Sequence, residues 1–486
     1  MSLDQLQDKS LFREQCHVNG KWVHADNGAT IDVDNPATGK TIGTVPSLGV
    51  REVENAIDAA DKGFAQWRRT TAGERGAILQ KWHDLMMENQ EDLARIMTTE
   101  QGKPITESRG EVAYAASFIK WFAGEAPRIY GETIPGAKPD QHIVVLKQPV
   151  GVSAAITPWN FPAAMITRKA GAALAAGCSM VVKPAEETPF TALALAELGR
   201  RAGLPAGVLN MINGNPAEIG DTLTASPVVR KMSFTGSTQV GRLLMEKCAQ
   251  HIQKISLELG GNAPFIVFDD ADLDKAVAGA MASKFRNTGQ TCVCVNRFLV
   301  QDSVHDAFVE KLRTAMADLK VGDGFEEGIN QAALINAAAV EKVDHHLQDA
   351  LDKGAKVICG GEPHPLGGNY VQPTLITGVK PEMQICHEET FGPLAGVMRF
   401  KTEEEAVAMA NDTPFGLASY FYSRDIHRCW RVAENLEYGI VGINEGLISN
   451  AAAPFGGVKE SGLGREGSHH GMDEFMEVKY CCMGGE

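Results

Sequence analysis

The chain has 486 residues, of which 44% are hydrophobic and 22% charged, proportions typical of folded globular proteins and long enough for about three domains. Asp and Glu number 61 against 46 Lys and Arg, so the net charge is −15, and a negative field repels nucleic-acid phosphates and anionic lipid. Composition and charge therefore exclude a disordered or coiled-coil chain and argue against nucleic-acid and membrane partners.

Cysteine usage and the N-terminal segment bear on location. The ten cysteines are too sparse for a disulfide scaffold, and the pairs Cys292/Cys294 and Cys481/Cys482 do not make the framework of a zinc site. We therefore expect reduced thiols and no metal. Residues 1–15 are charged and lack an apolar signal core, and the most apolar stretch is too short to span a bilayer. The prediction is a cytoplasmic protein.

The order of patterns along the chain predicts the fold class. Residues 50–125 repeat apolar residues at helical spacing and predict a helical region. Between residues 151 and 241 short apolar runs alternate with helical stretches, which predicts a parallel sheet covered by helices on both faces. The expected strands there are GVSAAIT, SMVVKP, GVLNMI and KMSFTG, and the expected helices are 162–177, 189–202 and one from about 238. KVICGGE and GPLAGVMRF, with helices at 340–353 and EEEAVAMAN, predict a second α/β domain.

The segment KMSFTGSTQVG has the pattern of a phosphate site. A strand ends at Phe234, Gly236 and Ser237 form the turn, and a helix follows, so a helix N-terminus meets the end of a parallel strand. The glycines do not follow G-x-G-x-x-G, so an ordinary strand-to-helix turn is the alternative.

Lys183 and Glu186 follow the strand SMVVKP, on the side where open α/β sheets bind ligands. A lysine can donate to ribose hydroxyls, and Glu186 can accept from an adenosine 2′-hydroxyl. Because that carboxylate repels a 2′-phosphate, the pair favours NAD over NADP, although Lys183 and the open loop would also admit NADP. The alternative is a solvated charged loop.

Two further residues have catalytic potential. Glu258 ends an apolar strand before a Gly-Gly turn, where partial burial would raise its pKa toward that of a general base. Cys292 follows the polar loop Thr288–Thr291, where a thiol near a cofactor can be kept as a reactive thiolate. Taken singly, a salt-bridged carboxylate and a buried, inert cysteine are the more ordinary readings.

Seven motifs in order together resemble the motif series of the aldehyde dehydrogenases. They are PWNFP at 158–162, KPAEETP at 183–189, FTGST at 234–238, ELGGNAP at 258–264, GQTCV at 289–293, EETFGP at 388–393 and PFGGVKESGLGRE at 454–466. The resemblance covers nearly the whole chain. Seven ordered motifs are far more specific than any one of them.

The resemblance implies a mechanism and a set of site residues. Cys292 is the nucleophile that forms a thiohemiacetal and then a thioester, Glu258 is the general base for deacylation, and Asn160 stabilises the oxyanion together with the Cys292 main-chain N–H. Because Glu258 activates water, a free acid is favoured over a coenzyme A ester. Cofactor contacts are implied for Trp159, Lys183, Glu186, Gly236, Ser237, Leu259, Glu389 and Phe391.

Within the family, WNFPAAMITRK and KFRNTGQTCVCVNRF are most similar to the succinate-semialdehyde dehydrogenases. Arg168 and Arg286 flank the motifs of Asn160 and Cys292, and guanidinium groups bind carboxylates through charge-assisted hydrogen bonds. We therefore expect a small aldehyde that bears a carboxylate, with Ser449 as an additional donor implied by the resemblance. Structural salt bridges are the alternative for both arginines, and glutarate semialdehyde or another aldehyde is the alternative substrate.

Cys294 and the segment Gln331–Ile335 depart from simple motif matching. The spacing of Cys294 from the nucleophile suggests a redox switch through a reversible disulfide, with a packing role as the alternative. QAALI stands where the family commonly has Gly-Pro before the leucine. We expect that change to alter local turn geometry only, since the segment is remote in sequence from the catalytic motifs.

The expected architecture is an aldehyde dehydrogenase-like α/β fold in three parts. They are a Rossmann-type dinucleotide-binding domain at 1–125 and 149–255, an α/β catalytic domain at 256–467 and a small β oligomerisation element at 126–148 and 468–486. The resemblance implies a homodimer or homotetramer. A non-catalytic NAD-binding protein of this fold is the competing class, and intact Cys292, Glu258 and Asn160 argue against it.

Overall fold

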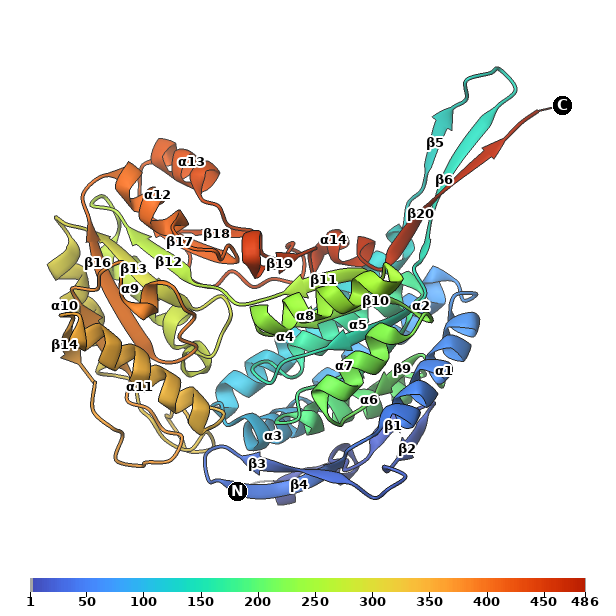
Figure 1. Ribbon diagram of the computed structural model, residues 1–486, viewed down its shortest axis with the longest axis horizontal. Coiled ribbons are helices and arrows are strands. Elements are labelled where there is room, and N and C mark those ends of the chain that lie inside the picture. Colours follow the sequence, from blue (N-terminus) through green and yellow to red (C-terminus); the bar gives the residue numbers. More distant parts are fainter. Residues whose placement is uncertain (1–2, 486) are drawn as a thin grey trace.

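A computed structural model describes residues 3–485 (Figure 1). Two large sheets with their helices form the body, and a slender three-stranded arm extends away from it and carries the C-terminus near its tip. None of the helices in residues 3–485 is both long and apolar enough to cross a membrane.

The first large sheet has eight strands in the order β19-β11-β10-β7-β8-β9-β1-β2. Strands β11 to β9 run parallel, and β1, β2 and β19 add antiparallel edges. The strands are β1 Cys16–Val18, β2 Lys21–Val23, β7 Val152–Ile156, β8 Ser179–Lys183, β9 Leu209–Met211, β10 Val229–Thr235, β11 Lys254–Glu258 and β19 Gly462–Leu463. A separate hairpin joins β3 Thr30–Asn35 to β4 Lys40–Pro46.

Helices cover both faces of this sheet because side chains alternate along its strands. Ala154 and Val181 pack with α1 and α7, whereas Ala155 and Val182 pack with α2 to α6 on the other face. The helices are α1 Val50–Trp67, α2 Ala72–Glu88, α3 Gln90–Gln101, α4 Ile105–Glu125, α5 Ala164–Ala176, α6 Pro189–Ala202, α7 Pro216–Ala225 and α8 Thr238–Cys248. Local signals set their ends: Thr71 and Glu74 form a capping box before α2, and Gly177 ends α5 at φ +99°.

The second sheet has seven strands in the order β14-β15-β16-β13-β12-β17-β18, all parallel except β14. Apolar clusters fill both of its faces. Its strands are β12 Ala263–Val267, β13 Val295–Gln301, β14 Lys356–Cys359, β15 Thr374–Thr377, β16 Leu394–Phe400, β17 Ala418–Tyr422 and β18 Ile440–Ile443. Its helices are α9 Leu273–Phe285, α10 His305–Met316, α11 Ala337–Asp352, α12 Glu403–Asn411 and α13 Ile426–Asn435.

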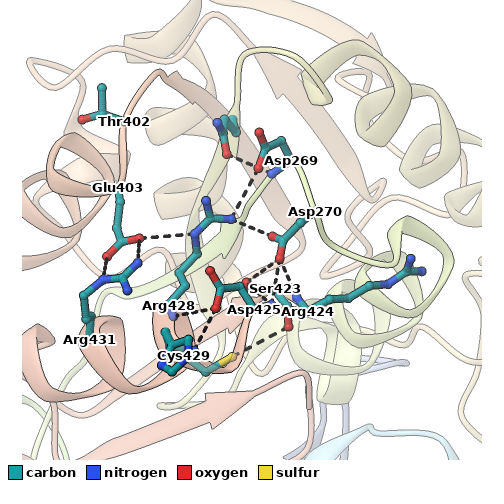
Figure 2. Close-up of polar contacts among 12 residues, drawn as sticks. Asp269, Asp270, Thr402, Glu403, Ser423, Arg424, Asp425, Arg428, Cys429 and Arg431 are labelled. Carbon is teal, nitrogen blue, oxygen red and sulfur yellow. Dashed lines mark hydrogen bonds and ion pairs between the residues drawn. The ribbon is translucent and has the colours of Figure 1, made fainter.

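An ion network anchors α12 and α13 to the loop after β12 (Figure 2). Arg428 lies 2.7 Å from Asp270 and 3.2 Å from Glu403, and Arg431 lies 2.8 Å from Glu403. Asp270 also accepts the main-chain N–H of Asp425 at 2.9 Å, just before α13 begins. Several charges thus share partners, which makes a network more effective than isolated surface pairs.

The arm consists of three antiparallel strands in the order β20-β6-β5. The strands are β5 Glu132–Pro135, β6 His142–Pro149 and β20 Met476–Met483, and the short helix α14 Ser468–Asp473 precedes the last of them. β20 pairs with β6 along its full length. Large apolar side chains on the arm are exposed, among them Val478 at 69% and Tyr480 at 62%.

The helices predicted within residues 50–125, the strands and helices predicted between residues 151 and 241, and those predicted at KVICGGE, GPLAGVMRF, 340–353 and EEEAVAMAN are present. The elements without a prediction include the N-terminal strands β1 to β4, helix α7, and β12, β13, β15, β17, β18, α9, α10 and α13 of the second sheet. The strands β1 and β2 have only three residues each, which is too short for the two-residue alternation to be recognised.

Candidate active site

Cys292 lies on a tight loop between a 3-10 turn at Arg286–Gly289 and strand β13. Asn287 and Thr288 both have positive φ, +51° and +53°, so the chain reverses sharply before the thiol. Burial raises the pKa of Cys292 to about 12, with the Arg168 charge opposing that rise. The free protein therefore holds Cys292 as a neutral thiol, not as the low-pKa thiolate expected from its polar loop.

Asn160 lies on the loop between β7 and α5 and contacts the Cys292 loop directly. Its Nδ2 donates to the carbonyl of Gln290 at 3.1 Å, and only 3% of the residue is exposed. The end of β7 belongs to the first sheet, whereas the loop that carries Cys292, called the nucleophile loop below, leads into β13 of the second sheet. The tertiary structure thus places the side-chain amide of Asn160 against the carbonyl of Gln290, two residues before Cys292.

Glu258 is the last residue of β11 and is 4% exposed. Its Oε2 is buried without a hydrogen-bond partner in the described part of the chain. Burial, and then the negative charge of Glu466, raise the pKa of Glu258 well above its usual value. The raised pKa makes the Glu258 carboxylate a stronger proton acceptor than an ordinary glutamate.

A buried charge network lies beside Glu258. Arg168 Nε lies 2.5 Å from Glu466 Oε2, Lys169 pairs with the other oxygen of Glu466, and Lys169 Nζ also donates to Thr235 Oγ1 at 2.7 Å. The two cations lower the pKa of Glu466 despite its burial. Arg168 therefore does make a structural ion pair, the alternative left open by the sequence.

Arg168 retains unused hydrogen-bonding capacity nevertheless. Its Nη2 is buried with no partner among residues 3–485, and its guanidinium carbon lies 3.9 Å from the ring centroid of Phe455. Nη1 contacts only the sulfur of Met165, at 3.4 Å. An unpaired buried guanidinium N–H is costly unless a ligand accepts from it.

A cavity of about 350 Å³ opens beside Cys292. It is lined by Trp159, Asn160, Gly236, Ser237, Leu259, Cys292, Glu389 and Phe391, together with Pro158, Met165, Thr235, Gly260, Ala338, Ala339, Lys342 and Thr390. Ser237 caps α8, its hydroxyl accepting the Val240 N–H at 3.3 Å, so the start of that helix lies at the cavity. The structure thus brings together eight of the residues that the sequence analysis singled out.

Glu389 is positioned to accept hydrogen bonds in this cavity. It accepts the Gly261 N–H at 3.3 Å, and burial raises its pKa to about 7. The rings of Trp159 and Phe391 meet edge to face, with centroids 5.4 Å apart. A Cβ on Gly260 would lie 3.0 Å from Glu389 Oε2, so a side chain at residue 260 would displace that carboxylate.

Lys183 and Glu186 lie apart from the cavity around Cys292. Lys183 is the last residue of β8, next to Ile156 on β7, and so shares a sheet edge with the strands that lead to Asn160 and Gly236. Its ammonium pairs with the carboxylate of Glu186, which is 37% exposed. The two residues thus lie at the same sheet edge but do not line the cavity beside Cys292.

On the other side of Cys292 lies a small recess that brings the remaining predicted residues together. It is lined by Tyr114, Phe161, Met165, Arg168, Arg286, Thr291, Cys292, Val293, Ser449 and Phe455. The guanidinium carbon of Arg286 stacks 4.7 Å from the Phe161 ring centroid, and Arg286 has no ion pair within residues 3–485. Tyr114, Phe161, Arg286 and Ser449 also line a second cavity, of about 690 Å³.

Cys294 is buried at 2% exposure, behind the loop. Its thiol donates to the Lys284 carbonyl at 3.2 Å, and burial raises its pKa. The Lys284 ammonium is also buried and has no hydrogen-bond partner in the described chain, and the two side chains attract each other. No disulfide joins Cys292 to Cys294.

One expectation is wrong. The segment Gln331–Ile335 packs directly against the nucleophile loop: the Ala332 N–H donates to Thr288 Oγ1 at 2.9 Å and the Ile335 N–H donates to Gln290 Oε1 at 3.0 Å. The sequence suggested a remote segment because separation along the chain does not reveal which loops lie against each other in the folded protein. The departure from Gly-Pro therefore touches the catalytic loop itself.

Several site residues were missed by sequence reasoning. Phe161, Phe455 and Glu466 lie within the motifs listed above, but nothing in those motifs indicates that these side chains face the site. Tyr114 and Lys342 have no local signal at all, because they face the site from the middle of α4 and α11, on helices that look like ordinary amphipathic cover.

The chain was compared with known proteins. The sequence model described as aldehyde dehydrogenase family matches residues 22–481. A glutarate-semialdehyde dehydrogenase of Pseudomonas aeruginosa is 62% identical over 99% of this chain and 100% of its own length. An NADP(+) succinate-semialdehyde dehydrogenase of Escherichia coli is 61% identical over 99% and 100%.

Solved structures agree with these sequence relatives. The crystal structure of a succinate-semialdehyde dehydrogenase from Burkholderia pseudomallei superposes with a TM-score of 0.98, at 60% identity, over 99% of this chain and 100% of that one. At this similarity the backbone paths of the two chains are nearly the same, and the predicted fold class is confirmed.

Proposed function

Since the chain belongs to the aldehyde dehydrogenase family, we propose that it oxidises a small carboxylated aldehyde, succinic semialdehyde, to the dicarboxylic acid. The observation that carries the substrate class is the buried guanidinium of Arg168, whose unpartnered Nη2 lines the recess beside Cys292. Arg286 and Ser449 supply further donors in the same recess. The names of the two similar relatives, which act on four- and five-carbon semialdehydes, support the same class.

The first step is attack by the Cys292 sulfur on the aldehyde carbon. Because the pKa of Cys292 is about 12, a base must take its proton, and Glu258 is the carboxylate whose raised pKa suits it to that task. The amide N–H of Asn160 and the Cys292 main-chain N–H stabilise the oxygen of the thiohemiacetal, each such donor being worth about 10²–10³ in rate.

The cofactor is NAD(P), which when bound supplies the hydride acceptor. Trp159, Leu259 and Phe391 give the cavity apolar walls, and Gly236 and Ser237, at the turn before α8, line it as well. Glu389 would hold a ribose. We propose NAD as the preferred form, because the Glu186 carboxylate opposes a 2′-phosphate, with NADP as the alternative.

Deacylation completes the reaction. Glu258 takes a proton from water as that water attacks the thioester, and Cys292 leaves as the thiol once it regains a proton. The carboxylate needs to be ionised for this step, so deacylation should slow as pH falls through the raised pKa of Glu258.

Four further assignments stay proposals. The division into a cofactor domain, a catalytic domain and an oligomerisation element at the boundaries predicted above is supported by the separate eight-, seven- and three-stranded sheets. The exposed apolar side chains of the arm support assembly into a dimer or tetramer. A redox role for Cys294 draws support from the buried Lys284 ammonium beside it, and a cytoplasmic location still rests on composition alone.

The proposal is tested with three aldehydes: succinic semialdehyde, glutaric semialdehyde and uncharged butanal, each with NAD and NADP. For Arg286→Ala we expect kcat/KM to fall about 10–100-fold on the semialdehydes, the equivalent of one charge-assisted hydrogen bond, and to stay near wild type on butanal. Arg313→Ala, on the surface of α10, is the matched control. Equal loss on all three aldehydes would sink the carboxylate assignment, and activity in Cys292→Ala would sink the mechanism.

A further inference from the structure

Lys103 is a fully buried lysine outside the catalytic motifs. It lies on the connection between α3 and α4, and its ammonium donates to Glu111 Oε2 at 2.5 Å and to the main-chain carbonyl of Asn160 at 2.7 Å. Nζ also lies 4.1 Å from the ring centroid of Phe161. Two acceptors and a ring face thus account for its three protons, so Lys103 is a tightly held group, not a vacant binding site.

Glu111, the partner of Lys103, contacts the next segment of the same loop. Its Oε1 accepts the N–H groups of Ala163 at 2.9 Å and Ala164 at 3.3 Å, where α5 begins. Ala163 has no side chain that could cap the helix, so Glu111 does so from α4. The ion pair therefore holds the loop from both ends, by the carbonyl of residue 160 and by the amides that follow it.

A second donor completes the hold on the Asn160 carbonyl. Asn287 Nδ2 donates to that carbonyl at 3.0 Å and to the Gln290 carbonyl at 3.2 Å. The Asn160 side chain in turn donates to the same Gln290 carbonyl. Two donors from different elements fix the peptide plane of Asn160 and hence the direction in which its amide points.

We propose that Lys103 and Glu111 are positioning residues for Asn160, and set the placement of its amide for oxyanion stabilisation. A buried ion pair is a poor source of stability, since apolar residues of similar volume often do as well. The buried ion pair is explained better by its two contacts with the loop: Lys103 fixes the carbonyl of Asn160, and Glu111 fixes the start of α5. The inference rests on the proposed role of Asn160.

The test is a double-mutant cycle of Lys103→Met with Asn160→Ala, read as the stopped-flow rate of NADH formation in a single turnover. Lys103→Met should slow that turnover about 10–100-fold, because a misplacement near 1 Å costs about 10². In the Asn160→Ala background the same change should cost less than about 3-fold, and the NAD concentration at half saturation should not move in either background.

Lys231→Met is the matched control. Lys231 is equally buried, lies 2.9 Å from Glu474 Oε2 and 5.6 Å from the Phe475 ring, and does not contact the Asn160 loop. It should lose thermal stability while keeping the single-turnover rate. If Lys103→Met does not fold, Lys103→Met with Glu111→Leu removes both charges and takes its place in the cycle.

The outcomes separate the two claims. Asn160→Ala at the wild-type rate overturns the oxyanion role and the positioning role together. A slow Asn160→Ala with losses that multiply in the double variant leaves the oxyanion role standing and overturns the positioning role, as does a wild-type rate in Lys103→Met.

Discussion

Gly261 offers a sharp test of how closely the backbone controls Cys292. A Cβ at residue 261 would lie 2.7 Å from the Cys292 carbonyl oxygen, whereas ordinary contact begins at 3.4 Å. Gly261→Ala must therefore open a gap of about 0.7 Å, and the yielding group is the main chain of the nucleophile. Because a displacement near 1 Å costs about 10² in rate, we expect kcat to fall about 10–100-fold. Overpacking should cost about 1–3 kcal/mol in stability.

The assay is steady-state NADH formation at saturating NAD and aldehyde, with thermal unfolding measured on the same samples. Gly73→Ala is the control, since residue 73 is exposed on α2 and its Cβ would meet nothing within 4 Å. It should keep full activity. A folded Gly261→Ala variant whose kcat lies within twofold of wild type would refute the reasoning, because the loop would then absorb the clash without moving the reacting sulfur.

Three further outcomes are expected. Burial raises the pKa of Glu258 most, and the negative charge of Glu466 raises it further. Glu466→Gln removes that charge, so the pKa of Glu258 should fall and the acid limb of the kcat–pH profile should move to lower pH. An unmoved limb would contradict the effect of Glu466 on Glu258. Glu186→Gln should raise the ratio of kcat/KM for NADP over NAD about tenfold, or 1.4 kcal/mol, and an unchanged ratio means that Glu186 does not face the 2′ position. Tyr480→Asp adds a charge to the exposed arm and should yield a smaller species in size-exclusion chromatography. An elution volume equal to that of the wild type would show that the arm does not mediate assembly.

Local pattern carries much of this fold. The helices of residues 50–125 were predictable because each buries one face, and apolar residues then recur at the helical period. The alternation of strands and helices in residues 151–241 was predictable because a parallel strand needs a crossover, which helices provide. The strand end at Glu258 and the loop at Cys292 follow from short-range signals of the same kind.

The sequence by itself also determined which residue types meet the chemistry, since a thiol, a carboxylate and an amide stand in recognisable motifs. Only the tertiary structure decided their states. Burial makes Cys292 a neutral thiol and raises the pKa of Glu258, and burial depends on which other segments pack over a residue.

The partners of the charged residues were decided in the same way. Arg168 pairs with Glu466, almost 300 residues away. Lys103 donates a hydrogen bond to the carbonyl of Asn160, and the QAALI segment donates one to Thr288 before Cys292. Such contacts join elements that chain topology brings together after the sheets form. A periodicity or a motif describes only a short stretch of chain, so it cannot predict a contact between segments that lie far apart in the sequence.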